Sequence, residues 1–310
     1  MRVEEIITFL TRKPELRKFK AGALKDYFLR EGHKYVSKRA CAIALQDLDS
    51  TKGKVDKLKP VQPKVLIYDI ETSPNVGWFW RAGYKQNIGP NQILEERKII
   101  CLSYKWAGED KVYSLNWDTE QDDKFLLEQF IEVLNEADLI VAHNGDRFDI
   151  KWIRTRALYH RLDMLPKYKQ FDTLKVAKSK LYLNSNRLDY IAKFLGFEGK
   201  IVTRHNLWGE VCFDNNRDSL VEMIEYCEED VIQLEHVYNE LKHLDNPRLH
   251  VGRLNDRPRS TSPITGTYNA EVVKTETTPA GTIKYIMRDL ETGRYFEMSE
   301  SNYKKFHNLK

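Results

Sequence analysis

Cysteines are few in this chain of 310 residues, and long apolar runs are absent from it. Its four cysteines are widely scattered and show no Cys-x-x-Cys spacing, so we expect neither a zinc knuckle nor a disulfide framework. No apolar run approaches the roughly 18 residues that a membrane span needs. The first residues are acidic and lack the apolar core of a signal peptide. We therefore expect a cytoplasmic protein that has no membrane partner.

Charged residues of both signs are abundant but unevenly distributed. Residues 1–60 hold 15 Lys and Arg against 8 Asp and Glu, residues 61–250 hold 25 against 31, and residues 251–310 hold 10 against 7. An acidic centre between basic flanks suggests a metal-binding body with arms that meet a polyanion. Alternatively, the Lys-rich flanks are ordinary solvated surfaces.

The predicted elements divide the chain into several parts. Residues 1–50 alternate helical segments with short breaks and predict a small basic helical module, whose last helix begins at the N-cap Ser37. The module suits a helix-turn-helix or winged-helix domain in which Lys34, Lys38 and Arg39 face phosphates, and a helical domain without a ligand fits equally. Residues 51–64 have the polar, charged composition of a linker.

The main body, residues 65–246, combines apolar strands with amphipathic helices. We expect strands over residues 65–70, 99–106, 111–116 and 139–142, and helices over 122–137, 149–160, 172–178, 187–195 and 219–244. The predicted strands come first in the chain, most helices come later, and one strand-helix-strand unit lies between them. This order predicts an α/β domain with a mixed sheet flanked by helices. A second linker over residues 247–261 and a small β-rich tail over residues 262–310 follow.

Two acids lie inside residues 65–72, a run that otherwise predicts a buried strand. Side chains alternate across a strand, so Asp69 and Glu71 point to one face, about 7 Å apart along the backbone. Burying two unpaired carboxylates costs on the order of several kcal/mol, so a cation such as Mg²⁺ or Mn²⁺ between them would explain why the strand keeps both. Alternatively, the acids lie at a strand end and meet solvent or a lysine.

Two further acidic motifs occur later in the chain. A loop that contains Asn144 and Asp149 follows the strand over residues 139–142 and opens into a helix, which is where α/β sheets build their sites. Tyr226 and Asp230 are four residues apart in a long predicted helix, so both project from the same face.

The three motifs together resemble those of the DEDD exonuclease superfamily, in its tyrosine subgroup. They read Asp-Ile-Glu-Thr at residues 69–72, His-Asn-(x)₄-Asp at 143–149 and Tyr-(x)₃-Asp at 226–230, and the resemblance runs from about Val65 to Leu244. It implies a ribonuclease H-like fold and 3′-to-5′ hydrolysis of phosphodiester bonds with two divalent cations, Mg²⁺ or Mn²⁺. Asp69 would bridge the ions, and Glu71 and Asp230 would complete the shell of one. Asp149 would hold the other ion, and Tyr226 would orient the attacking water.

The same resemblance assigns residues to the substrate. Thr72 and Ser73 lie where the family contacts the terminal nucleotide, and Asn144 belongs to the second motif. Trp78 and Trp80 would stack on a terminal base, or alternatively form an aromatic core loop.

Three residues near the second motif compete for a role. Asp146 is a rival to Asp149, which we favour because Phe148-Asp149 follows the family pattern and starts the helix. Asp172 fits an N-cap or a supporting acid better than a catalytic one. His143 fits a structural histidine better than a ligand.

The residue spacing in the tail resembles that of a zinc ribbon, but the cysteines of a ribbon are missing. Ser262, Thr265, Asp289 and Thr292 stand at the four ligand places, and hydroxyls bind zinc poorly. Our hypothesis is a degenerate ribbon that holds no zinc and could still contact nucleic acid. The alternative is an unrelated small β element.

The sequence therefore predicts a stand-alone, metal-dependent 3′-to-5′ exonuclease, without a polymerase domain, that acts on DNA. An exoribonuclease of the same superfamily is one alternative, because the metals contact phosphate and do not distinguish the sugar. An inactive nucleic-acid-binding or replication scaffold protein is the other. The expected partners are single-stranded DNA or 3′ ends, alternatively RNA, and replication or repair proteins. We expect a bacterial or phage-infected host cytoplasm.

Overall fold

The computed structural model describes residues 3–13, 16, 18–33, 36–42, 44–45, 62–81, 83, 87–197, 204 and 206–307. The chain divides into two compact units, residues 63–298 and residues 1–62 together with 299–310. Residues 51–61, most of the first predicted linker, lie outside the described residues, and the predicted domain boundaries stay predictions. Within the described ranges, no helix has both the length and the apolar character that a membrane crossing requires.

The first unit is helical in its described parts. It contains α1 (Val3–Arg12), α2 (Ala21–Arg30), helical residues 38–42 and 44–45, and α11 (Glu300–Phe306). The Ser37 hydroxyl accepts the Ala40 N–H at 3.0 Å, which confirms Ser37 as an N-cap. Buried apolar residues of the helices, among them Ile6, Leu24 and Phe28, form a separate core. Lys38 and Arg39 are exposed, Lys34 lies outside the described residues, and nucleic-acid binding by the module stays a prediction.

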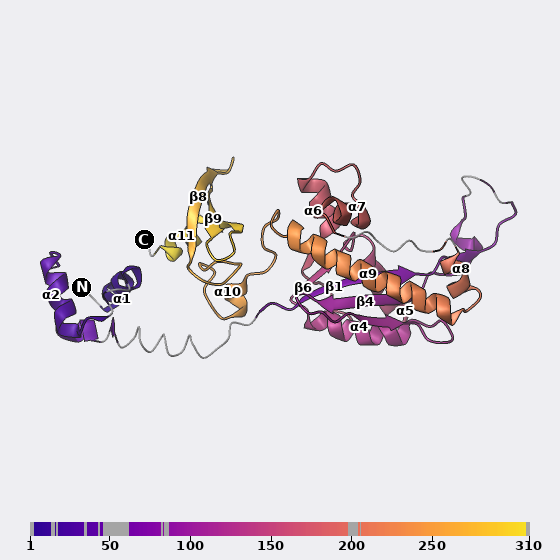
Figure 1. Ribbon diagram of the computed structural model, residues 1–310, viewed down its shortest axis with the longest axis horizontal. Coiled ribbons are helices and arrows are strands. Elements are labelled where there is room, and N and C mark those ends of the chain that lie inside the picture. The colour runs from indigo at the N-terminus through magenta and orange to yellow at the C-terminus, as the bar shows by residue number, and fades with distance from the viewer. Residues whose placement is uncertain are drawn as a thin grey trace. The chain divides into compact units, whose positions relative to one another are not determined.

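A five-stranded mixed sheet forms the centre of the second unit, in the order β5-β4-β1-β6-β7 (Figure 1). Its strands are β1 (Val65–Thr72), β4 (Ile99–Trp106), β5 (Tyr113–Asn116), β6 (Leu139–Ala142) and β7 (Gln170–Asp172). Strand β1 runs antiparallel to β4 and parallel to β6, so it lies in the middle of the sheet. Central strands are buried on both faces, which explains the apolar sequence of β6 and of the first half of β4.

Helices cover both faces of this sheet. They are α4 (Lys124–Glu136), α5 (Asp149–Tyr159), α6 (Thr173–Lys180), α7 (Leu188–Phe194), α8 (Leu207–Cys212) and α9 (Arg217–Leu241). Leu66, Tyr68 and Ile70 point to one face and share a core with α4 and α5. Ile67 points to the other face and shares a core with α6, α7 and α9. Alternation along β1 therefore sends successive side chains into two different cores.

The predicted elements and the observed ones agree best where strands are buried. The strands over residues 99–106 and 139–142 and the mixed sheet are confirmed. The sequence did not predict β7 or α8, and β5 begins at Tyr113 rather than at residue 111. A short hairpin of β2 (Val76–Gly77) and β3 (Ile93–Glu95) was also missed.

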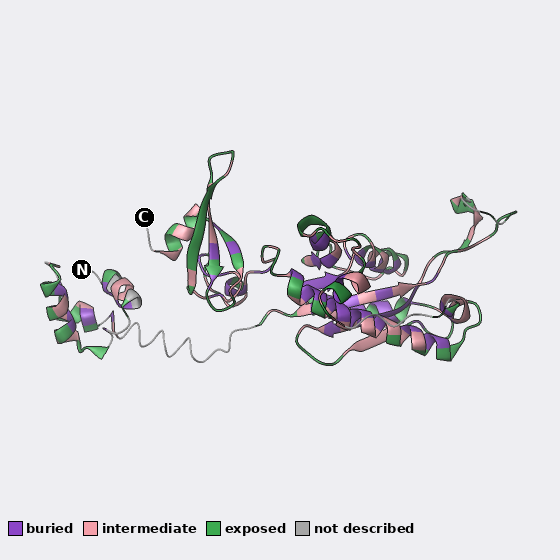
Figure 2. Ribbon diagram, turned by 45° about the horizontal axis from the view of Figure 1, so that its top comes forward, coloured by how far each residue is buried: buried purple, intermediate pink, exposed green. Residues whose placement is uncertain are grey.

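The tail forms a small separate sheet in the order β10-β9-β8, preceded by α10 (Val251–Leu254). Its strands are β8 (Ala270–Thr277), β9 (Ile283–Asp289) and β10 (Tyr295–Ser299), and β8 is exposed along almost all of its length (Figure 2). The prediction of a small β-rich tail is confirmed. The Arg294 guanidinium donates to the Lys242 carbonyl oxygen at 2.6 Å and ties this sheet to the end of α9.

Candidate active site

Three of the predicted acids meet beside the sheet. One carboxylate oxygen each from Asp69, Glu71 and Asp230 lies within 4.8 Å of the others. In the antiparallel pair of β1 and β4, Asp69 lies opposite Ser103 and Glu71 lies opposite Cys101. The two acids are two residues apart in β1, so their side chains point to the same face of the sheet, and α9 packs on that face. Asp230 belongs to the buried side of α9 and is 5% exposed.

These donors fit a hard divalent cation. Carboxylates this close repel one another when ionised, and a cation between them removes that cost. Oxygen-only ligands are those that Mg²⁺ and Mn²⁺ prefer. The described residues at this point therefore match the predicted metal chemistry.

Asp149 lies next to this group but outside it. It is the first residue of α5 and is 2% exposed. Burial raises the pKa of the Asp149 carboxyl to about 7, although its own backbone N–H and that of Ile70 oppose the rise and the charge of Asp172 adds to it. Ile70 lies between the two acids of β1, so Asp149 reaches the strand that carries them. A cation would stabilise the charged form of this buried group.

The loop that precedes Asp149 is fixed by Asp172. This carboxylate accepts the backbone N–H groups of Asn144 at 3.0 Å, Asp146 at 3.2 Å and Lys175 at 3.2 Å. Asp172 is therefore the N-cap of α6, and it also holds the loop through two hydrogen bonds. Both contacts agree with its assignment as an N-cap or supporting acid. The side chain of Asp146 instead faces Lys175, at 3.6 Å.

Tyr226 is contacted by Trp208 of α8, an element that the motifs do not include. The Trp208 ring meets the Tyr226 ring edge-on, with centroids 6.4 Å apart, and the indole N–H donates to the Thr72 carbonyl oxygen at 3.2 Å. The Cys227 thiol donates to the Asp69 carbonyl oxygen at 3.6 Å, and burial raises the pKa of this thiol, so it stays neutral. Sequence reasoning missed Trp208 because nothing in its neighbourhood distinguishes it from a core aromatic.

A cleft of about 790 Å³ opens in front of these residues. Asp69, Asn144, Tyr226 and Asp230 line it. Its lining also includes His143, Leu174, Lys178 and the segment 184–189. Residues of all three motifs therefore contribute to one cavity, although Glu71 and Asp149 are not among those that line it.

The remaining predicted substrate residues do not line this cleft. Ser73 is buried, and its hydroxyl accepts the Lys98 N–H at 2.9 Å, while the Thr72 carbonyl is bound by Trp208. Trp78 and Trp80 are 43% and 90% exposed and make an edge contact, with ring centroids 5.7 Å apart. The alternative of an aromatic core loop is therefore wrong, and a substrate role for these four residues stays a prediction.

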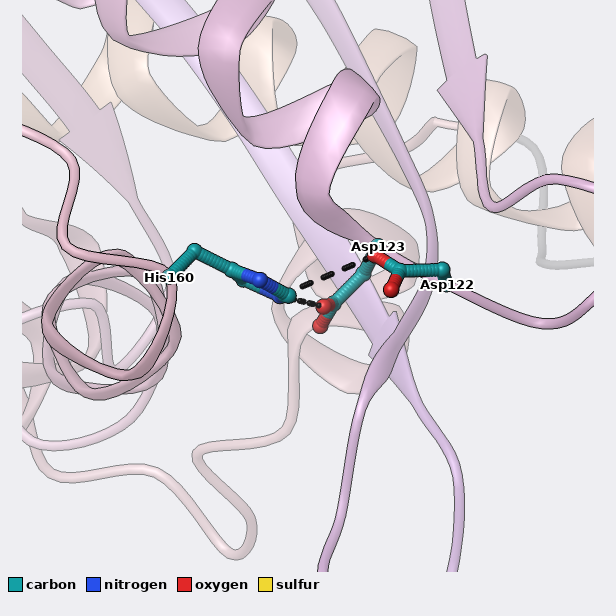
Figure 3. A group of neighbouring side chains, drawn as sticks. All are labelled: Asp122, Asp123 and His160. Atoms are coloured by element: carbon teal, nitrogen blue, oxygen red, sulfur yellow. Dashed lines mark hydrogen bonds and ion pairs between the residues drawn. The ribbon is translucent and has the colours of Figure 1, made fainter.

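A second group of two acids and a histidine, elsewhere in the domain, joins neighbouring elements through hydrogen bonds. Figure 3 shows Asp122, Asp123 and His160, of which Asp123 is fully buried. Its carboxylate accepts hydrogen bonds from Arg156 at 2.7 and 2.8 Å, from His160 at 2.6 Å and from the Ile99 N–H at 2.9 Å. Burial acts to raise the pKa of Asp123, but these hydrogen bonds hold it below its usual range. Arg156 occupies both oxygens, so the group joins α4, α5 and β4 without a metal.

In the tail, the four ribbon positions converge on one carboxylate. Asp289 is fully buried and accepts hydrogen bonds from the hydroxyls of Ser262 at 2.6 Å, Thr265 at 2.7 Å and Thr292 at 3.0 Å. Burial acts to raise its pKa, but the hydroxyl donors lower it. The four positions therefore lie together, and the hypothesis of a degenerate ribbon without zinc stays a prediction.

Part of this domain matches a known protein family. Residues 94–242 match the family model of the RNase_H superfamily. The central domain is ribonuclease H-like. This confirms the predicted fold of the domain and, at superfamily level, the resemblance on which it was based.

Relatives with similar sequences are large DNA polymerases. This chain is 26% identical over 110 residues to a DNA polymerase of Methanocaldococcus jannaschii, a match that covers 36% of this chain and 6% of that protein. It is 28% identical over 115 residues to the catalytic subunit of DNA polymerase epsilon from Dictyostelium discoideum, a match that covers 33% of this chain and 5% of that protein. The chain thus matches only a small part of each relative.

A solved structure is also similar. The family B DNA polymerase of Pyrobaculum calidifontis matches with a TM-score of 0.47 and 14% identity, over 72% of this chain and 32% of that one.

Proposed function

We propose that this protein is a metal-dependent 3′-to-5′ exonuclease of the tyrosine subgroup that hydrolyses phosphodiester bonds of nucleic acid, with DNA as the preferred polymer. The proposal rests on one observation. The carboxylates of Asp69, Glu71 and Asp230 lie close together beside a cleft that Tyr226 also lines. The ribonuclease H-like domain and the DNA polymerases among its relatives support it.

The acids would hold two divalent ions. Asp69, Glu71 and Asp230 would hold one ion, and Asp149 together with Asp69 would hold the other. Bound Mg²⁺ or Mn²⁺ would neutralise charge on the scissile phosphate and acidify a water molecule. The carboxylates must be ionised to hold the ions. The positive charge of the ions favours this ionised form.

The other residues of the site orient the reactants. Tyr226 projects from α9 one turn before Asp230, so its hydroxyl is placed to position an attacking water. A tyrosine is a weak base at neutral pH, so its part is orientation. Trp208 supports the Tyr226 ring, and Asp172 fixes the loop that carries Asn144. Asn144 lines the cleft and would contact the terminal nucleotide.

Labelled substrates test the proposal directly. The purified chain is incubated with single-stranded DNA and RNA, labelled at the 3′ or the 5′ end, in Mg²⁺, in Mn²⁺ and in EDTA. We expect immediate release of the 3′ label as mononucleotide and gradual shortening of the 5′-labelled strand, only with metal. Release of the 5′ label first, or no release from either polymer, would refute the proposal. Faster cleavage of RNA would identify the exoribonuclease alternative.

Substitution of one ligand separates activity from binding. Asp69→Asn removes a charge from the acid group at nearly constant volume, so we expect turnover to vanish while binding of a fluorescent oligonucleotide persists. Asp146→Asn is the matched control, because Asp146 lies outside the acid group and pairs with Lys175. Full turnover by Asp69→Asn would remove Asp69 from the site. Turnover by neither the wild type nor the control would favour a scaffold protein.

A further inference from the structure

A small second cavity lies where the tail meets the central domain, and it shares no lining residue with the cleft. Val65 and Leu139, the first residues of β1 and β6, line it together with Arg294 of the tail. Asp69 lies four residues further along β1 than Val65, about 13 Å along the strand. The cavity therefore lies at the end of β1 that is remote from the acid group.

The size of this cavity limits what it can hold. Its volume is about 110 Å³, which is enough for a few water molecules or for one small ion. Pockets that take drug-sized ligands begin at roughly 300 Å³. The cavity therefore fits a single small chemical group and no whole nucleotide.

The lining of the cavity is cationic. Lys242, Arg248 and Arg294 line it, and no aspartate or glutamate of the described residues does. Arg248 pairs with Asp245 at 2.5 Å, whereas neither Lys242 nor Arg294 forms an ion pair within the described ranges. The Arg294 guanidinium donates to the Lys242 carbonyl oxygen, so these two residues are neighbours. Two half-buried cations therefore lie beside the cavity without an acid that pairs with either.

Both side chains are less easily charged here than in water. Burial lowers the pKa of Lys242, and the charge of Arg294 lowers it further, although the charges of two glutamates on α9 oppose these effects. Burial also lowers the pKa of the Arg294 guanidinium, against the charges of Tyr238 and Asp289. An anion between the two cations would stabilise the charged form of each.

Arg294 also has a donor without an acceptor. A guanidinium carries five N–H donors, and the Lys242 carbonyl oxygen accepts one of them from Nη2 at 2.6 Å. The Nε atom of Arg294 is buried and has no hydrogen-bond partner among the described residues. A buried N–H group costs free energy unless an acceptor reaches it. An anion in the cavity would supply such an acceptor.

We propose that this cavity binds one phosphate group between Lys242 and Arg294, and that the bound phosphate fastens the tail to the end of α9. A phosphate offers several oxygen acceptors, so it can accept from the ammonium group and from the guanidinium together. Lys242 directly follows α9 and Arg294 directly precedes β10, so a shared phosphate links the two elements. Inorganic phosphate and the phosphates of a polynucleotide share this chemistry.

Calorimetric titration with sodium phosphate, in EDTA and at constant ionic strength, tests the binding. We expect one saturable site in the wild type and weaker binding of acetate. Lys242→Gln removes a charge but keeps the backbone carbonyl that Arg294 binds, so it should weaken phosphate binding about tenfold. Arg294→Gln should abolish it. Arg253→Gln is the matched control, because Arg253 is exposed and lies outside the cavity.

Equal weakening in Arg253→Gln, or a phosphate Kd that Lys242→Gln leaves unchanged, would overturn the inference. Hydrogen exchange gives a second readout that does not depend on Arg294→Gln, a variant in which the tail also loses its bond to α9. Phosphate should slow exchange in the last turn of α9 and in residues 290–294 of the wild type and of Arg253→Gln, and much less in Lys242→Gln. Exchange that phosphate leaves unchanged would refute the fastening of the tail.

A ten-nucleotide thymidine strand, titrated under the same conditions, distinguishes the two sources of phosphate. An increase of about tenfold in the Kd of the strand in Lys242→Gln would identify a polynucleotide as the ligand. An unchanged Kd of the strand, with the weakened binding of inorganic phosphate, would identify free phosphate. The inference does not rest on the proposed exonuclease function. A wild type that binds phosphate in this way and hydrolyses no nucleic acid would refute only the proposed function.

Discussion

The indole N–H of Trp208 donates to the Thr72 carbonyl oxygen at 3.2 Å and thereby joins α8 to the strand that carries Asp69 and Glu71. The same ring meets Tyr226 edge-on. Trp208 therefore connects the two elements that supply the acids and the tyrosine. We therefore expect Trp208 to position Tyr226, since it has no reactive group of its own.

We expect Trp208→Ala to lower kcat about two- to tenfold, because an edge contact between aromatic rings contributes about 0.5–1.5 kcal/mol. The decisive measurement is a double-mutant cycle on exonuclease kcat with Tyr226→Phe. If Trp208 acts through the Tyr226 hydroxyl, its removal changes little in the Tyr226→Phe background. Trp208→Phe keeps a ring and loses the N–H, which separates the two contacts. Additive effects in the cycle would contradict a positioning role.

His143→Ala should raise KM for oligonucleotides several-fold, with a smaller effect on kcat. The substitution removes the hydrogen bond that fixes the Asn186 carbonyl, and one such bond contributes about 0.5–1.5 kcal/mol. Steady-state kinetics on a labelled strand provide the measurement. His236→Ala, an exposed histidine outside the cleft, should leave both constants unchanged. A fall in kcat alone would place His143 in the chemistry instead.

Asp149→Asn should stabilise the metal-free protein at high pH. The folded pKa of about 7 lies above the ordinary value of 3.8, so the folded state retains a proton that the unfolded state loses. The contribution of Asp149 to stability is therefore fully present below about pH 4 and is lost as pH rises through 7. The cost of the buried charge above pH 7 is on the order of a few kcal/mol.

Urea unfolding in EDTA at pH values between 5 and 8 measures this difference. The gain of Asp149→Asn over the wild type should grow with pH and level off above about pH 7. Asp146→Asn, on the same loop but ion-paired and half-buried, is the control. A gain that does not grow with pH would show that Asp149 is not held as a buried acid.

Asp289→Asn should loosen the tail while the ribonuclease H-like domain keeps its stability. The amide cannot accept as strongly from Ser262 and Thr265, and bonds to a charged acceptor contribute about 1.5–3 kcal/mol each. Because the folded pKa of Asp289 is lowered, its contribution is present above the ordinary pKa and is lost as pH falls through the folded value. Hydrogen exchange of the β9 amides, at neutral and at acid pH, measures both effects.

The exposed Glu271→Gln on β8 is the control for the tail, and it should leave exchange unchanged. Metal analysis of the wild type should find no stoichiometric zinc. Cysteines at positions 262, 265, 289 and 292 together should create a zinc site, since the four positions already converge. Stoichiometric zinc in the wild type would contradict the metal-free ribbon.

The sequence alone determined the features that local periodicity encodes. The alternation in residues 65–72 placed Asp69 and Glu71 on one face, and the spacing of four placed Tyr226 and Asp230 together, because strands and helices repeat over a few residues. Apolar runs likewise gave the central strands β4 and β6 their correct bounds.

Only the tertiary structure decided which of these faces meet. Asp69 and Asp230 are far apart in sequence, and the packing of α9 on the sheet brings their carboxylates together. The same packing placed Trp208, Lys178 and Arg187 at the site and left Trp78 and Trp80 outside the cleft. No local pattern marks such residues, because their neighbours come from distant segments whose arrangement depends on the burial of the whole core.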